Sequence, residues 1–240
     1  MKAKFIMVDG LDGSGKGTVI NTLKYHLEKK GKKIFDLREH CKQHTAFPEF
    51  NEIKEHDVIV STEPTYSYIG KAIREEIVKE SERKYSGLST AYAFALDREV
   101  LYKKIIIPAI ENGKIILQER GVVSSFVYQP VQLERISLRD IMDLPGNRLA
   151  MKYAPSLLII TKVDPQVVIH RLRERQKQDH AIFEKLVFQR QIAERYESDW
   201  LKKLFESKGS KVKFLDTNYP KTVEDTQKAA INMFEEFCKE

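Results

Sequence analysis

Short apolar runs alternate along the chain with longer stretches in which apolar residues recur at helical spacing. Runs of this kind predict buried strands, and the clearest five cover residues 5–8, 58–60, 115–117, 157–160 and 212–215. Residues 33–37 form a weaker sixth candidate. Strands that alternate with helices favour a parallel sheet covered by helices on both faces.

The stretches between the runs predict helices from residue 18 to a stop at Gly31, over 69–80 and 90–112, and from Asp164 and Thr222 onward. Pro108 is expected to bend or break the helix over 90–112. Two segments fit neither pattern: 39–57 is interpreted as an insertion or long loop, and 130–150 as irregular. With no repeat or linker, residues 1–240 predict one α/β domain. A stripe of apolar residues at i+4 spacing predicts helix packing only: Phe188, Ile192, Tyr196, Trp200 and Leu204.

Composition narrows the class of protein. The 240 residues are 42% hydrophobic and 32% charged, with 41 basic and 35 acidic side chains that give a net charge of +6. That excess fits a solvated surface or a site for phosphate-bearing ligands. Cys41 and Cys238 form neither a disulfide framework nor a metal-ligand spacing. The first apolar run is too short for a signal peptide, and no run predicts a membrane span, so we expect a cytoplasmic protein.

A glycine-rich loop between the first strand and the first helix is the strongest motif. Its context, strand before and helix after, is that of a phosphate-binding loop, in which backbone N–H groups surround phosphate oxygens. Lys16 would reach the β- and γ-phosphates of ATP. Gly17 stands where such loops usually carry a hydroxyl ligand for Mg²⁺, so the metal would be held by ATP, water and a carboxylate elsewhere. The ATP-binding candidates are Gly10, Leu11, Asp12, Gly13, Ser14, Gly15, Lys16, Gly17 and Thr18.

Two further features suggest a site for a second phosphorylated ligand, and a third is a basic run that could serve phosphoryl transfer. Glu119 and Arg120 end an apolar run, where α/β folds place their chemistry. Glu119 would hold Mg²⁺ directly or through water, and Arg120 an acceptor phosphate. Phe94 and Arg98 share a helix face and suit a nucleobase, although a core residue beside a surface charge is an equally simple interpretation. The basic run 171–177 fits either a solvated helix face or a mobile lid.

Taken together, these motifs resemble the thymidylate kinase family over about residues 3–130 and 155–235. The segments that carry the resemblance read GLDGSGKGT (10–18), STEPTYSYIGKAIREE (61–76), FALDR (94–98), ERGVVSSFVYQ (119–129) and PSLLIITKVDPQVVIHRLRER (155–175). The resemblance implies a P-loop NTPase fold: a three-layer α/β/α arrangement with a five-stranded parallel sheet and a lid at about 171–184. It also implies a homodimer.

The same resemblance implies roles for individual residues. Phe94 would stack on thymine, Arg98 would contact the base, and Tyr128 would crowd the sugar 2′ position. Asp12 would take the 3′-hydroxyl. The implied catalytic residues are Lys16, Glu119, Arg173 and Arg175, and the implied substrate-binding residues are Asp12, Glu63, Phe94, Arg98, Arg120, Ser125, Tyr128 and Gln129.

The chain also departs from the family pattern. Thr62 stands where an arginine usually holds the acceptor phosphate, with Arg74 and His44 as open candidates to replace it. Glu119 replaces an aspartate, Gly121 an aromatic residue, and His180 falls where lids often carry arginine.

The resulting hypothesis is a Mg²⁺-dependent transfer of the γ-phosphoryl group of ATP to dTMP, giving dTDP. A kinase of the same fold with another nucleoside monophosphate or a deoxynucleoside as acceptor is the nearest alternative. A non-kinase ATP-binding or nucleic-acid-binding protein is a third. The chain carries no helix-turn-helix, zinc or RNA-binding motif, which disfavours nucleic acid as a partner, and a membrane partner is not expected.

Overall fold

The computed structural model describes residues 3–79, 82–131, 136–175 and 182–239, with only the backbone described for 172–175 and 182–185. Within them, six parallel strands form one sheet in the order β2-β3-β4-β1-β5-β6. The expected five strands are all present, and the difference is the edge strand β2, which pairs with β3. The strands are β1 (Lys4–Gly10), β2 (Ile34–Asp36), β3 (Val58–Thr62), β4 (Ile115–Glu119), β5 (Leu157–Lys162) and β6 (Lys211–Asp216).

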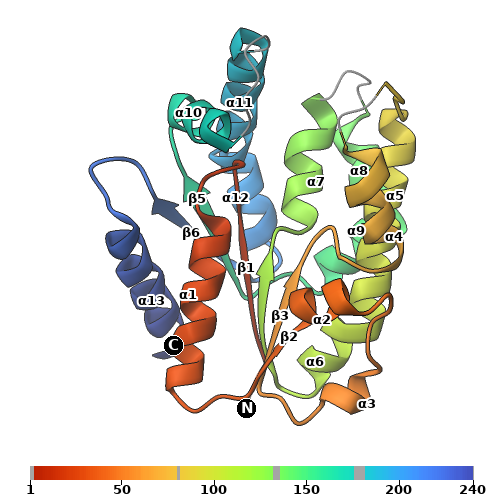
Figure 1. Cartoon of the computed structure of the whole chain (residues 1–240), viewed down its shortest axis with the longest axis vertical. Coiled ribbons are helices and arrows are strands. Elements are labelled where there is room, and N and C mark those ends of the chain that lie inside the picture. The colour runs from red at the N-terminus through yellow and green to blue at the C-terminus, as the bar shows by residue number, and fades with distance from the viewer. Residues whose placement is uncertain (1–2, 80–81, 132–135, 176–181, 240) are drawn as a thin grey trace.

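Side chains of each strand alternate between two cores, one on each face of the sheet. Ile6 and Val8 pack with helices α1 (Lys16–Lys29) and α13 (Val223–Lys239). Phe5 and Met7 pack with the larger helical layer on the opposite face. Figure 1 shows the resulting three layers, with α1 and α13 together on one face. The expected α/β/α arrangement is confirmed.

The larger layer is built mostly from helices that lie between β3 and β6 in the sequence. Its members are α4 (Tyr68–Ala72), α5 (Gly87–Leu101), α6 (Ile107–Glu111), α7 (Val122–Tyr128), α8 (Leu138–Asp143), α9 (Pro145–Lys152), α10 (Pro165–Arg175), α11 (Ile182–Tyr196) and α12 (Asp199–Glu206). Two π-helical turns, Ile73–Ile77 and Tyr102–Ile106, continue α4 and α5, and a 3₁₀ turn, Gln129–Val131, follows α7.

Three expectations about helices need correction. Pro108 does not break its helix, because the turn before it widens to π-type hydrogen bonding and α6 continues through it. The segment 130–150 is not irregular, since it contains α8 and α9. The i+4 stripe packs in the larger core as expected, but on two helices in place of one continuous helix, because α11 ends at Tyr196 and α12 begins at Asp199.

The segment 39–57 is not a plain loop either. It contains most of α2 (Leu37–Gln43) and all of α3 (Phe50–Ile53). Asp36, the last residue of β2, caps α2 by accepting a hydrogen bond from the backbone of Arg38 at 3.1 Å. The side chains of Leu37 and Cys41 are buried in the larger core. Together with β2, this helix forms a β2–α2 segment (34–43) that extends the sheet by an edge strand and a packed helix.

All strands run in the same direction, so their carboxyl ends share one edge of the sheet. In the register of the ladders, Glu119 at the end of β4 lies beside Val8 on one side and Thr62 on the other. Parallel α/β sheets bind ligands at this edge. The phosphate loop, the pair Glu63-Pro64 and Arg120 all follow directly from it.

Candidate functional site

The phosphate loop lies between β1 and α1, as its motif requires. Gly13 and Gly15 adopt left-handed conformations, with φ of 73° and 90°, which glycine reaches at little cost. The hydroxyl of Ser14 lies 2.6 Å from that of Thr161 on β5, which fixes the loop to the sheet. Arg171 on α10 donates to the carbonyl oxygen of Gly13 at 2.9 Å. The loop is thus held from two sides.

Lys16 is buried at the start of α1, and its ammonium group donates to the carbonyl oxygen of Leu11 at 2.6 Å. Burial, together with the nearby charge of Arg120, lowers the pKa of Lys16 from 10.5 to about 8. A buried cation beside loop amides and a helix N-terminus suits an anion as its counter-charge. A polyphosphate would supply that charge.

A cavity of about 500 Å³ opens over this loop. Besides the loop residues Asp12–Thr18, its walls include Glu119, Arg120, Arg171 and Lys221. The surface is mostly polar and carries several cations, as a site for a triphosphate needs. All of the ATP-binding candidates except Gly10 and Leu11 line it. Gly10 lies under the loop, where a Cβ atom would collide with Thr161.

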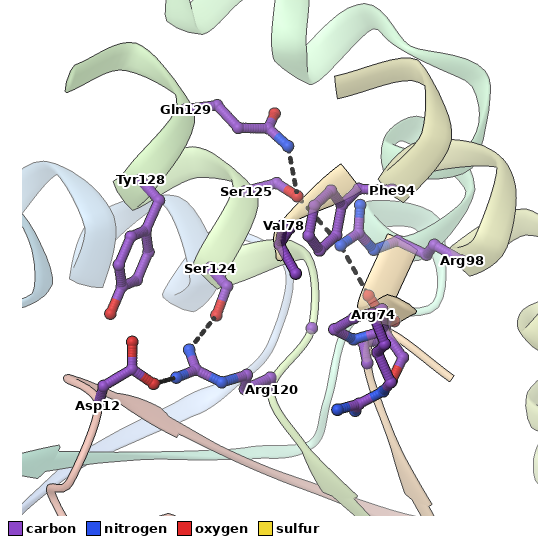
Figure 2. Close-up of a pocket in the computed structure, with 13 residues that line it drawn as sticks. Asp12, Arg74, Val78, Phe94, Arg98, Arg120, Ser124, Ser125, Tyr128 and Gln129 are labelled. Atoms are coloured by element: carbon purple, nitrogen blue, oxygen red, sulfur yellow. Dashed lines mark hydrogen bonds and ion pairs between the residues drawn. The ribbon is translucent and has the colours of Figure 1, made fainter. Parts of the chain in front are cut away.

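Arg120 lies at the centre of the site. Its guanidinium pairs with the carboxylate of Asp12 and donates to the hydroxyl of Ser124 at 3.2 Å (Figure 2). Its backbone is left-handed, with φ of 62°, a conformation that costs a non-glycine residue about 1 kcal/mol or more. The sharp turn places Arg120 between the cavity over the phosphate loop and a second cavity beside Phe94 and Arg98.

Asp9 is a site residue that the sequence patterns did not single out. It is fully buried at the end of β1 and accepts hydrogen bonds from the backbone of Ser124 at 3.1 Å and the hydroxyl of Tyr196 at 2.8 Å. These bonds fix the start of α7 beside the phosphate loop. Tyr196 was expected only to pack in a helix, so its role in this network is a correction. The one available signal was the position of Asp9 directly before the loop glycine.

A second cavity, of about 410 Å³, lies between α5 and α7. Figure 2 shows Phe94 and Arg98 on one side and Ser125, Tyr128 and Gln129 on the other, with Asp12 and Arg120 at one end. Its surface is mostly apolar with a few converging polar groups, which is typical of a site for a small organic ligand. The structure therefore brings together the expected substrate-binding residues Asp12, Glu63, Phe94, Arg98, Arg120, Ser125, Tyr128 and Gln129.

Arg98 is held by polar groups from several segments. It forms an ion pair with Glu63 at 2.6 Å, donates to Ser125 at 3.1 Å and contacts the amide oxygen of Asn147. Asn147 lies on α9, where a Cβ atom on Gly146 would collide with the backbone of α5, so glycine permits the close packing. The Nε atom of Arg98 and the Oε1 atom of Gln129 are buried without a hydrogen-bond partner among the described residues. Such atoms are suited to bind a polar ligand.

The pKa of Glu63 is raised from 4.5 to about 7, because burial outweighs the attraction of Arg98. At pH values between 4.5 and about 7, Glu63 is protonated more often in the folded protein than in the unfolded chain. Its contribution to stability is therefore present at low pH and is lost as pH rises toward 7.

We expect the difference in the free energy of unfolding, wild type minus Glu63→Gln, to decrease as the pH rises from 5 to 8. Glutamine carries no charge, so it keeps the shape of the side chain without its titration. Urea unfolding of both proteins at each pH measures the difference, and the other carboxyl groups cancel. A difference that grows with pH would mean that the ion pair with Arg98 dominates instead.

Comparison with known proteins decides the family. The thymidylate kinase family model matches residues 43–229. The chain is 30% identical over 192 residues to a thymidylate kinase of Caldicellulosiruptor saccharolyticus, covering 80% of each chain. It is also 30% identical over 200 residues to a probable thymidylate kinase of Pyrococcus abyssi, covering 82% of each. The chain belongs to the thymidylate kinase family.

The fold agrees with this membership. A crystal structure of thymidylate kinase from Ehrlichia chaffeensis superimposes with a TM-score of 0.62, covering 97% of this chain and 98% of that one at 18% identity. At that identity the likeness concerns the fold alone. Six strands in place of the expected five are the difference from the family arrangement that we anticipated.

The structure separates the candidates for the missing arginine at Thr62. Arg74 lines the cavity between α5 and α7 and a neighbouring polar cavity. Its Nε atom donates to the carbonyl oxygen of Pro64 at 2.9 Å. His44 instead stacks on His40 at 4.1 Å between ring centroids and lines a separate surface cavity. Of the two, only Arg74 borders the site.

Several lid expectations fall on residues that the structure does not describe. The side chains of Arg173 and Arg175 lie outside the described residues, although their backbone belongs to α10. His180 also lies outside the described residues. Their roles remain predictions of the family resemblance.

Proposed function

We propose that this protein transfers the γ-phosphoryl group of ATP to dTMP, giving dTDP and ADP. The observation that carries the proposal is the meeting of two cavities at Arg120: a polar one over the phosphate loop and an apolar one beside Phe94 and Arg98. Family membership supports the same reaction. A donor with a triphosphate and an acceptor with a base would place their phosphates toward each other there.

Phosphoryl transfer requires alignment and neutralisation of charge more than covalent chemistry by the protein. We propose that Lys16 and the loop amides bind the β- and γ-phosphates of ATP. Arg120 would hold the acceptor phosphate, and Arg173 and Arg175 would neutralise charge from the lid. Asp12, which pairs with Arg120, would exchange that contact for the sugar 3′-hydroxyl.

The nucleoside would lie in the cavity between α5 and α7. Phe94 is half-buried there and offers a ring face for stacking, while Arg98 and Gln129 offer polar atoms to the base edge. Tyr128 forms the wall beside Asp12, where it would limit the space for a 2′-hydroxyl (Figure 2). Ser125 and Glu63 orient Arg98 in this arrangement.

The experiment that tests the reaction is direct identification of its products. The purified protein, ATP, dTMP and Mg²⁺ are incubated together, and nucleotides are separated by chromatography. We expect dTDP and ADP in equal amounts. ADP without dTDP would indicate an ATPase, and absence of both would contradict the proposal.

Oxygen donors beside the loop fit a magnesium ion. A Cβ atom at Gly17 would lie 3.5 Å from Oε2 of Glu119, so this carboxylate faces the position that usually carries a hydroxyl ligand. We propose that Glu119 holds Mg²⁺, directly or through water. When bound, the ion would offset the charge on the ATP phosphates.

Gly17→Ser should restore a hydroxyl at this position and lower the Mg²⁺ concentration for half-maximal activity by about two- to tenfold, the range of one added polar contact. A Cβ atom fits there at ordinary contact distance. Gly17→Ala is the matched control, because it adds the Cβ atom without the oxygen. A serine variant whose Mg²⁺ dependence equals that of the alanine variant would contradict the assignment.

We also propose that the protein is a homodimer formed through α5. Leu88, Tyr92 and Leu96 repeat at i+4 spacing and are 49%, 55% and 50% exposed. An exposed apolar stripe of this kind is typical of an interface. Sedimentation should give twice the chain mass of 27.9 kDa, and Tyr92→Glu should give the single-chain mass. Wild type that sediments as one chain at micromolar concentration would contradict the proposal.

Within the described residues, the helices include none that is long and apolar enough to cross a bilayer. Cys41 and Cys238 are both free thiols. Thiols of this kind persist in a reducing compartment. We therefore propose a cytoplasmic location, where ATP is also available.

A further inference from the structure

A third cavity, of about 290 Å³ and mostly polar, lies at the carboxyl end of β3 and β4. It shares Glu63, Pro64 and Arg74 with the cavity between α5 and α7, and it shares Glu119 with the cavity over the phosphate loop. Arg120 lines all three. This cavity therefore lies where the phosphate of a bound nucleoside monophosphate would be attached.

Thr62 forms part of the wall of this polar cavity, beside Glu119 in the strand register. A threonine offers a hydroxyl but no positive charge. A monophosphate ester carries about −1.5 to −2 charges at neutral pH. The site therefore needs more cationic charge than Thr62 supplies, and the neighbouring carboxylates of Glu63 and Glu119 increase that need.

Arg38 enters the polar cavity from the β2–α2 segment (34–43). It is the second residue of α2, which follows the edge strand β2, and its side chain is mostly buried. Its Nη1 atom lies 3.8 Å from Oε2 of Glu119, so the guanidinium reaches the row of residues at the carboxyl ends of the strands. No pattern in the sequence placed it there, because β2 and β4 are far apart along the chain.

Polar partners on one side hold the guanidinium of Arg38 in a fixed direction. Asp36 accepts from Nε at 3.0 Å and from Nη2 at 2.8 Å, and Asn21 accepts from Nη2 at 2.9 Å. The two hydrogen bonds to Asp36 use Nε and Nη2, so Nη1 is the nitrogen that faces Glu119. A planar guanidinium fixed along one edge offers its other edge to an anion with little loss of side-chain entropy.

The other lysine or arginine of the β2–α2 segment, Lys42, is less well placed. Lys42 lies one turn after Arg38 but forms an ion pair with Glu39 at 2.8 Å and is about half exposed. A lysine at that position suits attraction of an anion at the entrance rather than a fixed contact. Arg38 combines burial, fixed geometry and contact with the cavity.

We propose that Arg38 binds the phosphate of the acceptor nucleoside monophosphate, together with Arg120 and Arg74. The added β2–α2 segment thus supplies the cation that Thr62 does not. The inference rests on the proposed function, because it needs an acceptor with a base in the adjoining cavity. Arg38 then determines preference for a nucleotide over the corresponding nucleoside.

The test compares Arg38→Gln and Arg38→Lys with wild type, using dTMP and thymidine as probes. Glutamine keeps a donor for Asp36 but removes the charge, so we expect the KM for dTMP to rise about 10- to 100-fold, as for loss of one charge-assisted hydrogen bond. The inhibition constant of thymidine, which has no phosphate, should stay within about twofold because no such bond is lost. Arg38→Lys should recover part of the loss.

Lys24→Gln is the matched control. Lys24 also forms an ion pair with Asp36, at 3.1 Å, but does not belong to the walls of the three cavities. Its removal should leave the KM for dTMP unchanged. Thermal unfolding of each variant shows whether the protein remains folded.

The outcomes separate this inference from the proposed function. Wild type that phosphorylates dTMP while Arg38→Gln has the same KM would overturn the role of Arg38 alone. An equal loss of dTMP and thymidine binding in Arg38→Gln would also overturn it, since that indicates damage to the whole site. Wild type that phosphorylates no nucleoside monophosphate would overturn both.

Discussion

Replacing Lys16 with methionine should lower kcat/KM for ATP by about 10³-fold, the order expected when a preorganised charge on the transferring phosphoryl group is lost. Lys16 is buried at the phosphate loop, and its ammonium group contacts the carbonyl oxygen of Leu11. Methionine has nearly the same length and fills the space without a charge. The effect should therefore be electrostatic.

Stability distinguishes this effect from unfolding. Burial lowers the pKa of Lys16 to about 8, because the charged ammonium group is less stable in the protein interior than in water. Removing it should leave the melting temperature unchanged or raise it. Binding of dTMP in the cavity between α5 and α7 should also be unchanged. A variant that loses stability and dTMP binding together with activity would contradict a role confined to the donor phosphates.

Arg98→Met should destabilise the protein by about 3–5 kcal/mol at pH 8, the range for breaking a buried ion pair. Both members of the pair with Glu63 are buried, and Arg98 also contacts Ser125 and Asn147. Its loss leaves the Glu63 carboxylate without its counter-charge in an apolar site. Urea unfolding measures the change, and dTMP turnover should fall below detection because the base loses its contact.

A double variant separates charge from packing in this prediction. Arg98→Met/Glu63→Gln removes both charges, so it should be less destabilised than the sum of the two single variants. Lys103→Met is a surface control, since Lys103 pairs with Glu99 in an exposed position. Free energies that add without coupling would mean that the two side chains do not depend on each other.

The sequence was most informative where local chemistry determines structure. The buried strands at 5–8, 115–117 and 157–160 need apolar side chains on both faces, so their runs are continuous and easily recognised. The phosphate loop needs glycine at its left-handed positions, which makes it equally recognisable. The helix expected from Thr222 onward is confirmed, and Thr222 and Asp225 exchange capping hydrogen bonds at 2.9 Å and 3.1 Å at its start.

Features that depend on contacts distant in sequence could not be predicted in the same way. The edge strand β2 is only three residues long and half-buried, so its pattern is weak. The helices α8 and α9 are short, and α9 matters because Asn147 contacts Arg98 on another helix. Arg38 lies between the weak strand candidate 33–37 and the segment 39–57 interpreted as an insertion or long loop. Its approach to Glu119 follows only from the parallel register of the strands.

If the two cavities bind ATP and dTMP for phosphoryl transfer, the most direct test is the relative kcat/KM for a set of nucleoside monophosphates. The set contains dTMP, dUMP, dCMP, dAMP and UMP, with ATP and Mg²⁺ saturating. We predict the highest kcat/KM for dTMP, with dUMP lower by about tenfold, the order of one methyl group in an apolar pocket. Higher kcat/KM for dAMP than for dTMP, or no turnover with any member of the set, would contradict that role of the two cavities.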